Sequence, residues 1–326
     1  MLFTREKLEH YQIQLYVAAL LVGAGVGLLW PEQGPTLENS ISIVLALMLY
    51  GMFTQIPFLQ LRRIMDNKRF VAALLLVNFV AVPMLVWLLT RFLPEHPPVL
   101  LGVYLVLLAP CIDYVIVFTQ LGKGDEKLML AATPLLFIAQ LLLLPLYLWM
   151  LVGAEAAQVV EAGPFVEAFL VLIAVPLVLA VFTQLWAKYR RSGEQLWNAA
   201  AWLPVPFMAV ALFVIMASQI GKAADHLDAI APVIPVYVAF MILSPALAYA
   251  ASRLFRLEAG ASRALAFSAG TRNSLVVLPL AFALPEEAAV IAAAAIVMQT
   301  IVELAGELVY IRVLPRLFKG HGRSHH

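Results

Sequence analysis

The sequence has few charged residues, and this scarcity excludes an ordinary soluble protein. Only 13% of the 326 residues are charged, whereas soluble domains carry about a quarter. The net charge of +1 gives no basis for binding nucleic acid. The hydrophilic stretches are too short to form a separate soluble domain. Apolar residues are abundant instead and make up 63% of the chain.

Cysteine is almost absent as well. Cys111 is the single cysteine, so the chain cannot form an intramolecular disulfide. The sequence also lacks an HExxH zinc motif and an ATP-binding P-loop pattern, which argues against a zinc hydrolase and against direct use of ATP. We therefore expect no cofactor.

The apolar residues form ten segments of about 20 residues, the length that an α-helix needs to cross a hydrocarbon core of about 30 Å. The segments do not alternate between apolar and polar residues, which excludes membrane-spanning strands. The sequence therefore predicts an all-α membrane protein with ten transmembrane helices in a single unit, residues 1–326. The predicted spans are 11–30, 38–58, 70–90, 98–121, 128–151, 164–187, 197–220, 229–251, 261–284 and 288–311.

Positive charges lie almost entirely on one side of the predicted membrane. All but three of the 21 Lys and Arg residues fall in the loops of one side or near the two ends; Arg91 and Lys222 lie opposite, and Arg272 lies inside a span. Because Lys and Arg gather in cytoplasmic loops, we expect both termini in the cytoplasm. We also expect an uncleaved first span and a location in a bacterial inner membrane.

Ten spans divide into two halves of five, and an odd number of spans gives the halves opposite topology. Inverted repeats of this kind are typical of secondary transporters, whose sites lie on interrupted helices near the bilayer midplane. The fourth span, 98–121, and the ninth, 261–284, each carry an interruption near the middle. We expect helices 4 and 9 to cross there and to form the site.

The two interruptions differ in chemistry. The first contains Pro110, which breaks a helix, and Asp113. The second, 268–274, contains Gly270 and Arg272 at a depth where irregular backbone is tolerated only inside protein or beside a cavity. A guanidinium at that depth costs at least about 2.5–3.5 kcal/mol and cannot lose its proton. We therefore predict that Asp113 pairs with Arg272 or shares an aqueous site with it; a purely structural ion pair is the alternative.

Other polar residues inside the spans are candidates for binding. Cys111 follows the first break, near the expected N-terminus of a half-helix that favours a thiolate; it suits a thiophilic solute or is a small buried hydrophobe. Glu303 and Glu307 share one helix face. Glu303 is a candidate proton carrier or a neutral acid bonded to backbone, and Glu307 is expected near the cytoplasmic end, in contact with solvent. The remaining candidates are Thr133, Gln140 and Gln299.

Several stretches resemble motifs of one superfamily. Cys111-Ile112, Val115, Val117, Leu121 and Lys123-Gly124-Asp125 look like RCxAMVxVWxxLAxGD, a motif of the arsenite-efflux (arsenical-resistance) branch of the bile acid/sodium symporter superfamily. Val302-Glu303 resembles the IEVPV stretch of that branch, and the run Gly270 to Ser274 resembles the EVGMQNS stretch of the sodium-coupled bile acid branch. The ten-span layout is similar to the superfamily over nearly the whole chain.

The resemblance implies a division into two parts and a role for the cysteine. A core part would hold residues 70–151 and 229–311, with the broken helices crossing at the site, and a panel part would hold residues 11–58 and 164–220. The branch's essential cysteine for arsenite falls on Cys111.

The departures from the family pattern bear on the coupling ion. The glutamate and glutamine that bind sodium in the bile acid branch are replaced by Ser268 and Arg272. The ninth-span glutamate of the arsenite branch falls on Leu275, and the arginine before its cysteine is replaced by Pro110. A site that has lost a carboxylate and gained a guanidinium should not hold sodium. The sequence therefore predicts a divergent subgroup that is coupled to protons.

These observations predict a secondary transporter in the lipid bilayer. It would export the metalloid compound arsenite, or a similar small oxyacid, in exchange for protons. The expected substrate-binding residues are Cys111, Asp113, Arg272, Asn273 and Ser274, with Cys111 as the ligand of arsenic(III). The expected proton carriers are Asp113 and Glu303. The supporting residues are Pro110, Thr133, Gln140, Ser268, Gly270, Thr271 and Gln299.

Three other functions stay open. A transporter of an organic anion, coupled to sodium or protons, would use Arg272 and the half-helix N-termini to bind a carboxylate. A passive channel would use the same spans without a moving barrier. An intramembrane aspartyl protease is suggested only by Gly122-Lys123-Gly124-Asp125, which matches GxGD but falls in a loop, so we expect no enzyme.

Overall fold

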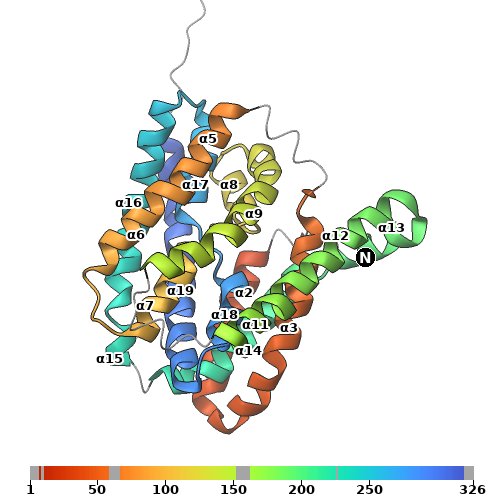
Figure 1. Ribbon diagram of the computed structural model, residues 1–326, viewed down its shortest axis with the longest axis vertical. Helices are drawn as coiled ribbons and strands as arrows, with labels where there is room; N and C mark the ends of the chain where they lie inside the picture. Colours follow the sequence, from red (N-terminus) through yellow and green to blue (C-terminus); the bar gives the residue numbers. More distant parts are fainter. Residues whose placement is uncertain (1–6, 9–10, 59–66, 152–161, 225–226, 319–326) are drawn as a thin grey trace, which may run out of the picture. The chain divides into compact units, whose positions relative to one another are not determined.

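The computed structural model is all-helical throughout the part of the chain that it describes (Figure 1). It describes every residue except 1–6, 9–10, 59–66, 152–161, 225–226 and 319–326. Five of the basic residues used to predict the orientation lie outside the described residues: Arg5, Arg62, Arg63, Lys319 and Arg323. The prediction of an all-α membrane protein is confirmed.

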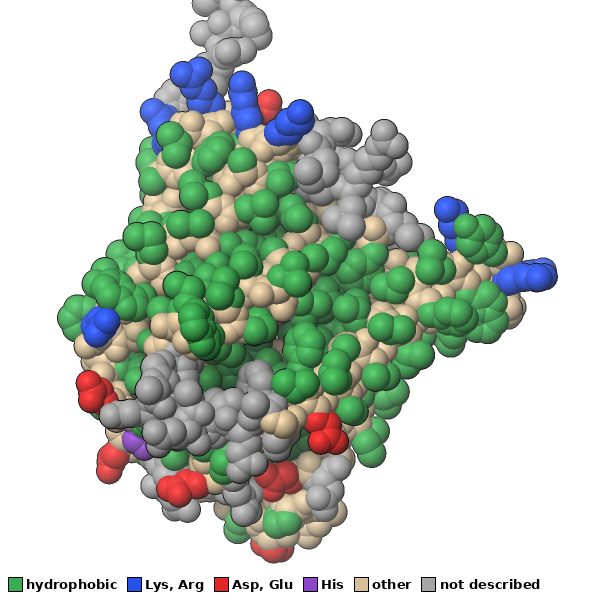
Figure 2. Space-filling view, in the orientation of Figure 1, with side chains coloured by type: hydrophobic (Ala, Val, Ile, Leu, Met, Phe, Trp, Pro, Cys, Tyr) green, Lys and Arg blue, Asp and Glu red, His purple; other side chains and the backbone are tan. Residues whose placement is uncertain are grey.

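Seven of the described helices are long and apolar enough to cross a membrane, or eight if one bent pair forms a single span. The seven are α2 (Gln12–Leu29), α5–α6 (Lys68–Thr90), α9 (Glu126–Leu151), the segment ending with α12 (Val166–Tyr189), α13–α14 (Arg191–Gly221), α15–α16 (Leu227–Leu254) and α19 (Glu287–Leu317). The bent pair is Pro31–Glu38 with Ser40–Gln55, in the region of α3 (Gly34–Gln55). Large apolar side chains such as Leu142, Trp149 and Phe182 are exposed, as expected of helices that face lipid. Figure 2 shows apolar side chains spread over much of the face that it draws.

The predicted spans 98–121 and 261–284 are each divided into two short helices. The first contains α7 (Pro97–Leu107) and α8 (Val115–Leu121), and the second contains α17 (Ala259–Gly270) and α18 (Ser274–Phe282). Both interruptions that the sequence predicts are therefore present. None of the four halves is long enough to count alone as a span.

The chain forms two compact units. Unit 1 comprises residues 1–55, 160–228 and 278–294, and unit 2 comprises residues 56–159, 229–277 and 295–326. Each unit is thus assembled from three separate stretches of the chain. The polar residues around both helix breaks belong to unit 2.

Unit 1 brings α2 directly against α14 (Pro204–Ala224) through small residues. A Cβ atom on Gly23 would lie 2.7 Å from the carbonyl oxygen of Phe213, and one on Gly27 would lie 2.5 Å from that of Ala217. Glycines spaced four apart allow two helix backbones in a membrane to approach closely. The spacing of Gly23 and Gly27 therefore sets the contact between these two helices.

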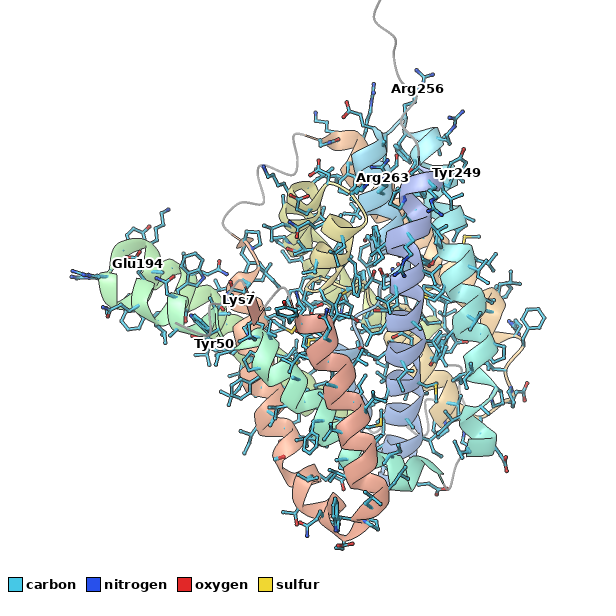
Figure 3. All side chains as sticks on the ribbon, turned by 180° about the vertical axis from the view of Figure 1, so that it is seen from behind. Lys7, Tyr50, Glu194, Tyr249, Arg256 and Arg263 are labelled. Carbon is cyan, nitrogen blue, oxygen red and sulfur yellow. The ribbon has the colours of Figure 1, made fainter. Side chains whose placement is uncertain are left out.

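Polar side chains join α3 to α12 (Val175–Tyr189) and α13 (Arg191–Ala200) within unit 1. The hydroxyl groups of Tyr50 and Thr183 lie 2.9 Å apart, and Trp197 Nε1 donates to the Thr54 carbonyl at 2.9 Å. Figure 3 shows Tyr50, from α3, and Glu194, from α13. These bonds give part-buried polar groups of three helices a partner.

Unit 2 contains a π-helical turn between α5 (Lys68–Leu76) and α6 (Val82–Thr90). The turn spans Val77–Ala81 and carries the fully buried Asn78. Single π-helical turns inside α-helices are frequent at functional sites. Here the turn presents one amide side chain to the interior of unit 2.

Basic residues gather at one end of unit 2. Arg263, near the start of α17, donates to the carbonyls of Lys123 and Phe318 at 2.8 and 3.0 Å. The backbone N–H of Asp125 donates to the Gly260 carbonyl at 3.1 Å. Figure 3 shows Arg256 and Arg263 at this end. The loop after α8, the start of α17 and the end of α19 therefore meet.

Candidate functional site

The two helix breaks lie against each other as a short antiparallel pair. Pro110 and Arg272 form the bridge, and two backbone hydrogen bonds flank it. The Cys111 N–H donates to the Thr271 carbonyl at 3.1 Å, and the Asn273 N–H donates to the Ala109 carbonyl at 2.8 Å. Each break thus satisfies backbone groups of the other, which allows irregular backbone at bilayer depth. We call this pair of segments, 109–113 and 271–273, the crossing.

Local sequence explains where the helices stop. Pro110 has no N–H to continue α7 and disfavours the helical conformation in the residue before it. The second break begins after Gly270, where a Cβ atom would lie 2.5 Å from the ring of Tyr310. Thr271 then takes an extended backbone conformation, with φ −86° and ψ 128°. The glycine therefore lets α19 pack closely against the end of α17.

The guanidinium of Arg272 joins the C-terminal ends of α7 and α17. Arg272 is fully buried. Its Nη2 donates to the carbonyls of Ser268 and Ala269 at 2.5 and 2.7 Å, and its Nη1 approaches the Leu107 carbonyl at 3.4 Å. Carbonyls at helix C-termini lack intrahelical partners and carry partial negative charge. The positive charge therefore lies where two helix ends favour it.

A side chain from the π-helical turn completes the surroundings of Arg272. Asn78 accepts a hydrogen bond from Arg272 Nη2 at 3.0 Å and donates to Ser268 Oγ at 3.0 Å. The guanidinium carbon lies 5.5 Å from the ring centre of Phe240, a cation–π distance. Sequence analysis missed Asn78, although it is the only amide in the predicted span 70–90.

The predicted pair between Asp113 and Arg272 does not form in the part of the chain that the structure describes. Asp113 instead accepts a hydrogen bond from the thiol of Cys111, with Sγ and Oδ1 2.8 Å apart. The guanidinium of Arg272 points toward the ends of α7 and α17, so it donates its hydrogen bonds to helix carbonyls and to Asn78. The alternative of an aqueous site shared by Asp113 and Arg272 stays a prediction.

Glu303, on α19, lies beneath the crossing and accepts three hydrogen bonds. Tyr114 Oη donates at 2.6 Å, the Arg272 N–H at 2.7 Å and Gln299 Nε2 at 2.5 Å. Its side chain is fully buried. Tyr114 also contacts the Arg272 carbonyl at 3.1 Å, so it connects α8 to the second break. Sequence analysis singled out Glu303 and Gln299 but not Tyr114.

Glu307 is fully buried, whereas the sequence analysis expected it to contact solvent. Its Oε1 lies 2.8 Å from the hydroxyl of Thr271, and its Oε2 is buried without a hydrogen-bond partner. The expectation was wrong because α19 is a 32-residue helix that passes the second break, so a residue one turn beyond Glu303 still faces the interior.

Unpartnered polar atoms gather at the start of α18. Asn273 Nδ2 and Ser274 Oγ are buried and have no hydrogen-bond partner. Asn273 Oδ1 accepts from the Val276 N–H at 3.4 Å and so caps the helix. The backbone N–H groups of a helix N-terminus attract anions. This end of α18 therefore has spare donors for a solute.

Two further residues with predicted supporting roles, Thr133 and Gln140, lie on α9. Thr133 donates to the Leu130 carbonyl of its own helix at 2.8 Å. Gln140, also on α9, is buried, and its Oε1 has no partner. Neither side chain forms a hydrogen bond with residues 109–113 or 271–273 in the described structure. Their predicted roles in binding stay predictions.

Comparison with known proteins identifies the family. Residues 42–226, more than half of the chain, match the model of the Sodium Bile acid symporter family. The chain belongs to this family. The matched residues include the first break and Cys111. Members of a symporter family carry solutes across membranes, so the chain is a membrane transporter.

One curated relative is an arsenical-resistance protein, Acr3, from Corynebacterium glutamicum. It is 24% identical over 201 residues, which cover 57% of this chain and 53% of the relative. The chain thus spans about half the length of the curated relative that it matches. The sequence resemblance to the superfamily and to its arsenical-resistance branch is confirmed.

Proposed function

We propose that this symporter-family protein is a secondary active transporter that exports arsenite, or a similar small oxyacid, in exchange for protons. The observation that carries the proposal is the thiol of Cys111, which lies in the crossing with its S–H on Asp113. The name of the arsenical-resistance relative supports the same solute. Thiolates bind soft ions and metalloids.

The Cys111–Asp113 pair has the chemistry to bind arsenous acid reversibly. The Cys111 sulfur would form one As–S bond while one As–O bond breaks. The thiol proton would pass to Asp113 Oδ1 and then to the departing hydroxide, which leaves as water. The 2.8 Å contact between Sγ and Oδ1 holds the proton acceptor in place for this step. Reversal of the step would release the solute on the other side.

Protons are the coupling ion that the charges around the crossing favour. Arsenous acid is neutral near pH 7, so the membrane potential can drive its export only if an ion is coupled to it. Asp113 and Glu303 are two carboxyl groups that lie in the crossing or contact it, which gives the crossing sites for protons. Arg272 already takes the oxygen ligands at the two helix ends that a sodium ion would need. We therefore infer that sodium is not coupled.

The same proposal includes ten spans arranged as a 5+5 inverted repeat, with both termini in the cytoplasm. The seven or eight long helices and the two divided ones support ten spans. The two compact units support the division into a panel part (11–58 and 164–220) and a core part (70–151 and 229–311), except that residues 278–294 of the core part fall in unit 1. We place the protein in a bacterial inner membrane.

Export or import of an organic anion is the second candidate. It is favoured by the buried, unpartnered Asn273 Nδ2 and Ser274 Oγ at the N-terminus of α18, which suit a carboxylate. Arg272 has little capacity left to bind a carboxylate, since only its Nε has no hydrogen-bond partner. Such a solute would not need the thiol of Cys111.

Uptake of radiolabelled arsenite into everted membrane vesicles tests the proposal. We expect an imposed proton gradient to drive uptake by the wild type and Cys111→Ser to abolish it. Serine keeps a donor for Asp113, so the thermal stability of the variant should stay close to that of the wild type. The absence of arsenite uptake by the wild type, or full uptake by Cys111→Ser, would refute the arsenite assignment. Uptake of carboxylates by both proteins would then favour the organic anion.

A further inference from the structure

Glu307 is a buried carboxyl group whose surroundings differ from those of Glu303. Both residues lie on α19 and face the second break, one helical turn apart. The carboxyl of Glu303 receives three donors. The carboxyl of Glu307 contacts a single hydroxyl, and its Oε2 has no partner although the residue is 0% exposed. The surroundings of Glu303 therefore favour a charged carboxylate, and those of Glu307 favour a protonated carboxyl group.

The hydroxyl of Thr271 indicates where a proton lies. Its oxygen is 2.7 Å from the Phe267 carbonyl and 2.8 Å from Glu307 Oε1. A hydroxyl has one hydrogen, so it cannot fully serve both acceptors. If Glu307 is protonated, it donates to Thr271 Oγ1, and Thr271 donates to Phe267. If Glu307 is charged, a buried carboxylate depends on one shared donor, which is unfavourable.

The charges around Glu307 also favour its protonated form. The ionisable groups that face it are Glu303 and Tyr310 on its own helix and Arg272 on the second break. The residues of α16 (Val233–Leu254) that contact Tyr310 are Met241 and Ser244, which do not titrate near neutral pH. Among the groups that face Glu307, one guanidinium balances one carboxylate, and Glu303 has the donors to be that carboxylate. A second negative charge one turn away would be unbalanced.

We propose that Glu307 is a further proton-binding site of the transporter, occupied in this conformation, while Glu303 holds no proton here and its carboxylate balances Arg272. This inference deepens the proposed proton coupling and rests on it only for the transport cycle. On release, the O–H bond of Glu307 breaks, the proton passes to water, and the Thr271 hydroxyl turns to donate to the new carboxylate. The Thr271 carbonyl also accepts from the Cys111 N–H at 3.1 Å. One residue therefore connects the proton site to the thiol.

Infrared difference spectroscopy of the purified protein tests the occupancy without any solute. We expect the wild type minus Glu307→Gln spectrum to show the C=O band of a protonated carboxylic acid that shifts in D₂O. The wild type minus Glu303→Gln spectrum should show carboxylate bands instead. Glu258→Gln, at an exposed position before α17, is the matched control and should show carboxylate bands. Carboxylate bands from Glu307 would overturn the proposal.

A second variant covers the case in which Glu307→Gln fails to fold. Thr271→Val keeps the shape of the side chain and removes the oxygen that Glu307 contacts. We expect it to move the carboxylic acid band to higher frequency, because the acid loses its hydrogen-bond acceptor. An unchanged band would show that the protonated acid is not Glu307.

Proteoliposomes connect the proton site to transport. We expect Glu307→Gln to lose the stimulation of arsenite uptake by a proton gradient, measured as the ratio of uptake with and without the gradient. Glu258→Gln should keep the wild-type ratio. An unchanged ratio in Glu307→Gln would show that its proton is not the coupled one. If the wild type carries no arsenite, the proposed function fails, and the infrared result still decides whether Glu307 binds a proton.

Discussion

Arg272 stabilises the second break by neutralising helix ends, and its removal should weaken the whole of unit 2. Methionine at this position would leave the carbonyls of Ser268 and Ala269 without a donor and would remove the positive charge that we propose balances Glu303. Loss of one partner from a buried charged group destabilises by about 3–5 kcal/mol. We expect Arg272→Met to lower the thermal unfolding temperature in detergent strongly. Lysine should rescue only part of this loss, because it lacks the planar fork of donors.

The exposed Arg91 gives a control for that measurement. It lies over the Trp87 ring at 4.8 Å, outside the crossing. Arg91→Met should change stability by less than about 1 kcal/mol. Equal losses in Arg91→Met and Arg272→Met would contradict the role assigned to Arg272.

The sequence alone located this charge but not its partners. A guanidinium inside a span requires compensation, so Arg272 and the two breaks were predictable from residue type and depth. The direct pair with Asp113 is not formed in the described structure, where Asp113 bonds to Cys111. The carbonyls that hold the guanidinium instead could not be predicted, because carbonyls at helix ends carry no sequence signal. Asn78 and Tyr114 were missed because the sequence does not reveal which direction an isolated polar residue in an apolar span faces.

At the scale of helices, the contact between α2 and α14 depends on glycine. Gly27→Ala would place a Cβ atom 2.5 Å from the Ala217 carbonyl, so the two backbones must separate. Overpacking of this kind destabilises by about 1–3 kcal/mol. We expect a lower unfolding temperature in detergent for Gly27→Ala.

The same helix supplies the matched control. Gly25 has no atom within 4 Å of an added Cβ. Gly25→Ala should stabilise the helix by up to about 1 kcal/mol, because alanine loses less backbone entropy than glycine. A stable Gly27→Ala protein, or two variants with equal effects, would show that close packing at Gly27 is not required.

At the scale of the whole molecule, the proposed ten spans place Lys7 and Glu258 on one side of the membrane and Glu95 on the other. Because Cys111 is the only cysteine, Cys111→Ser provides a cysteine-free background. We expect Lys7→Cys and Glu258→Cys to react with a membrane-impermeant maleimide in everted vesicles and Glu95→Cys to react in intact cells. Reaction of Lys7→Cys and Glu258→Cys from opposite sides would require an odd number of spans between them and would rule out this topology.

The short backbone pairing in the crossing also fixes a register. Side chains alternate along extended segments, so a slip of one break by one residue would turn its side chains to the opposite face relative to the other break. Such a slip would break the bonds between Cys111 and Thr271 and between Asn273 and Ala109 together. Tilting of the half-helices about this pair breaks neither bond. The two breaks are therefore held as one block, and a movement that carries a solute past the crossing would have to move both breaks together.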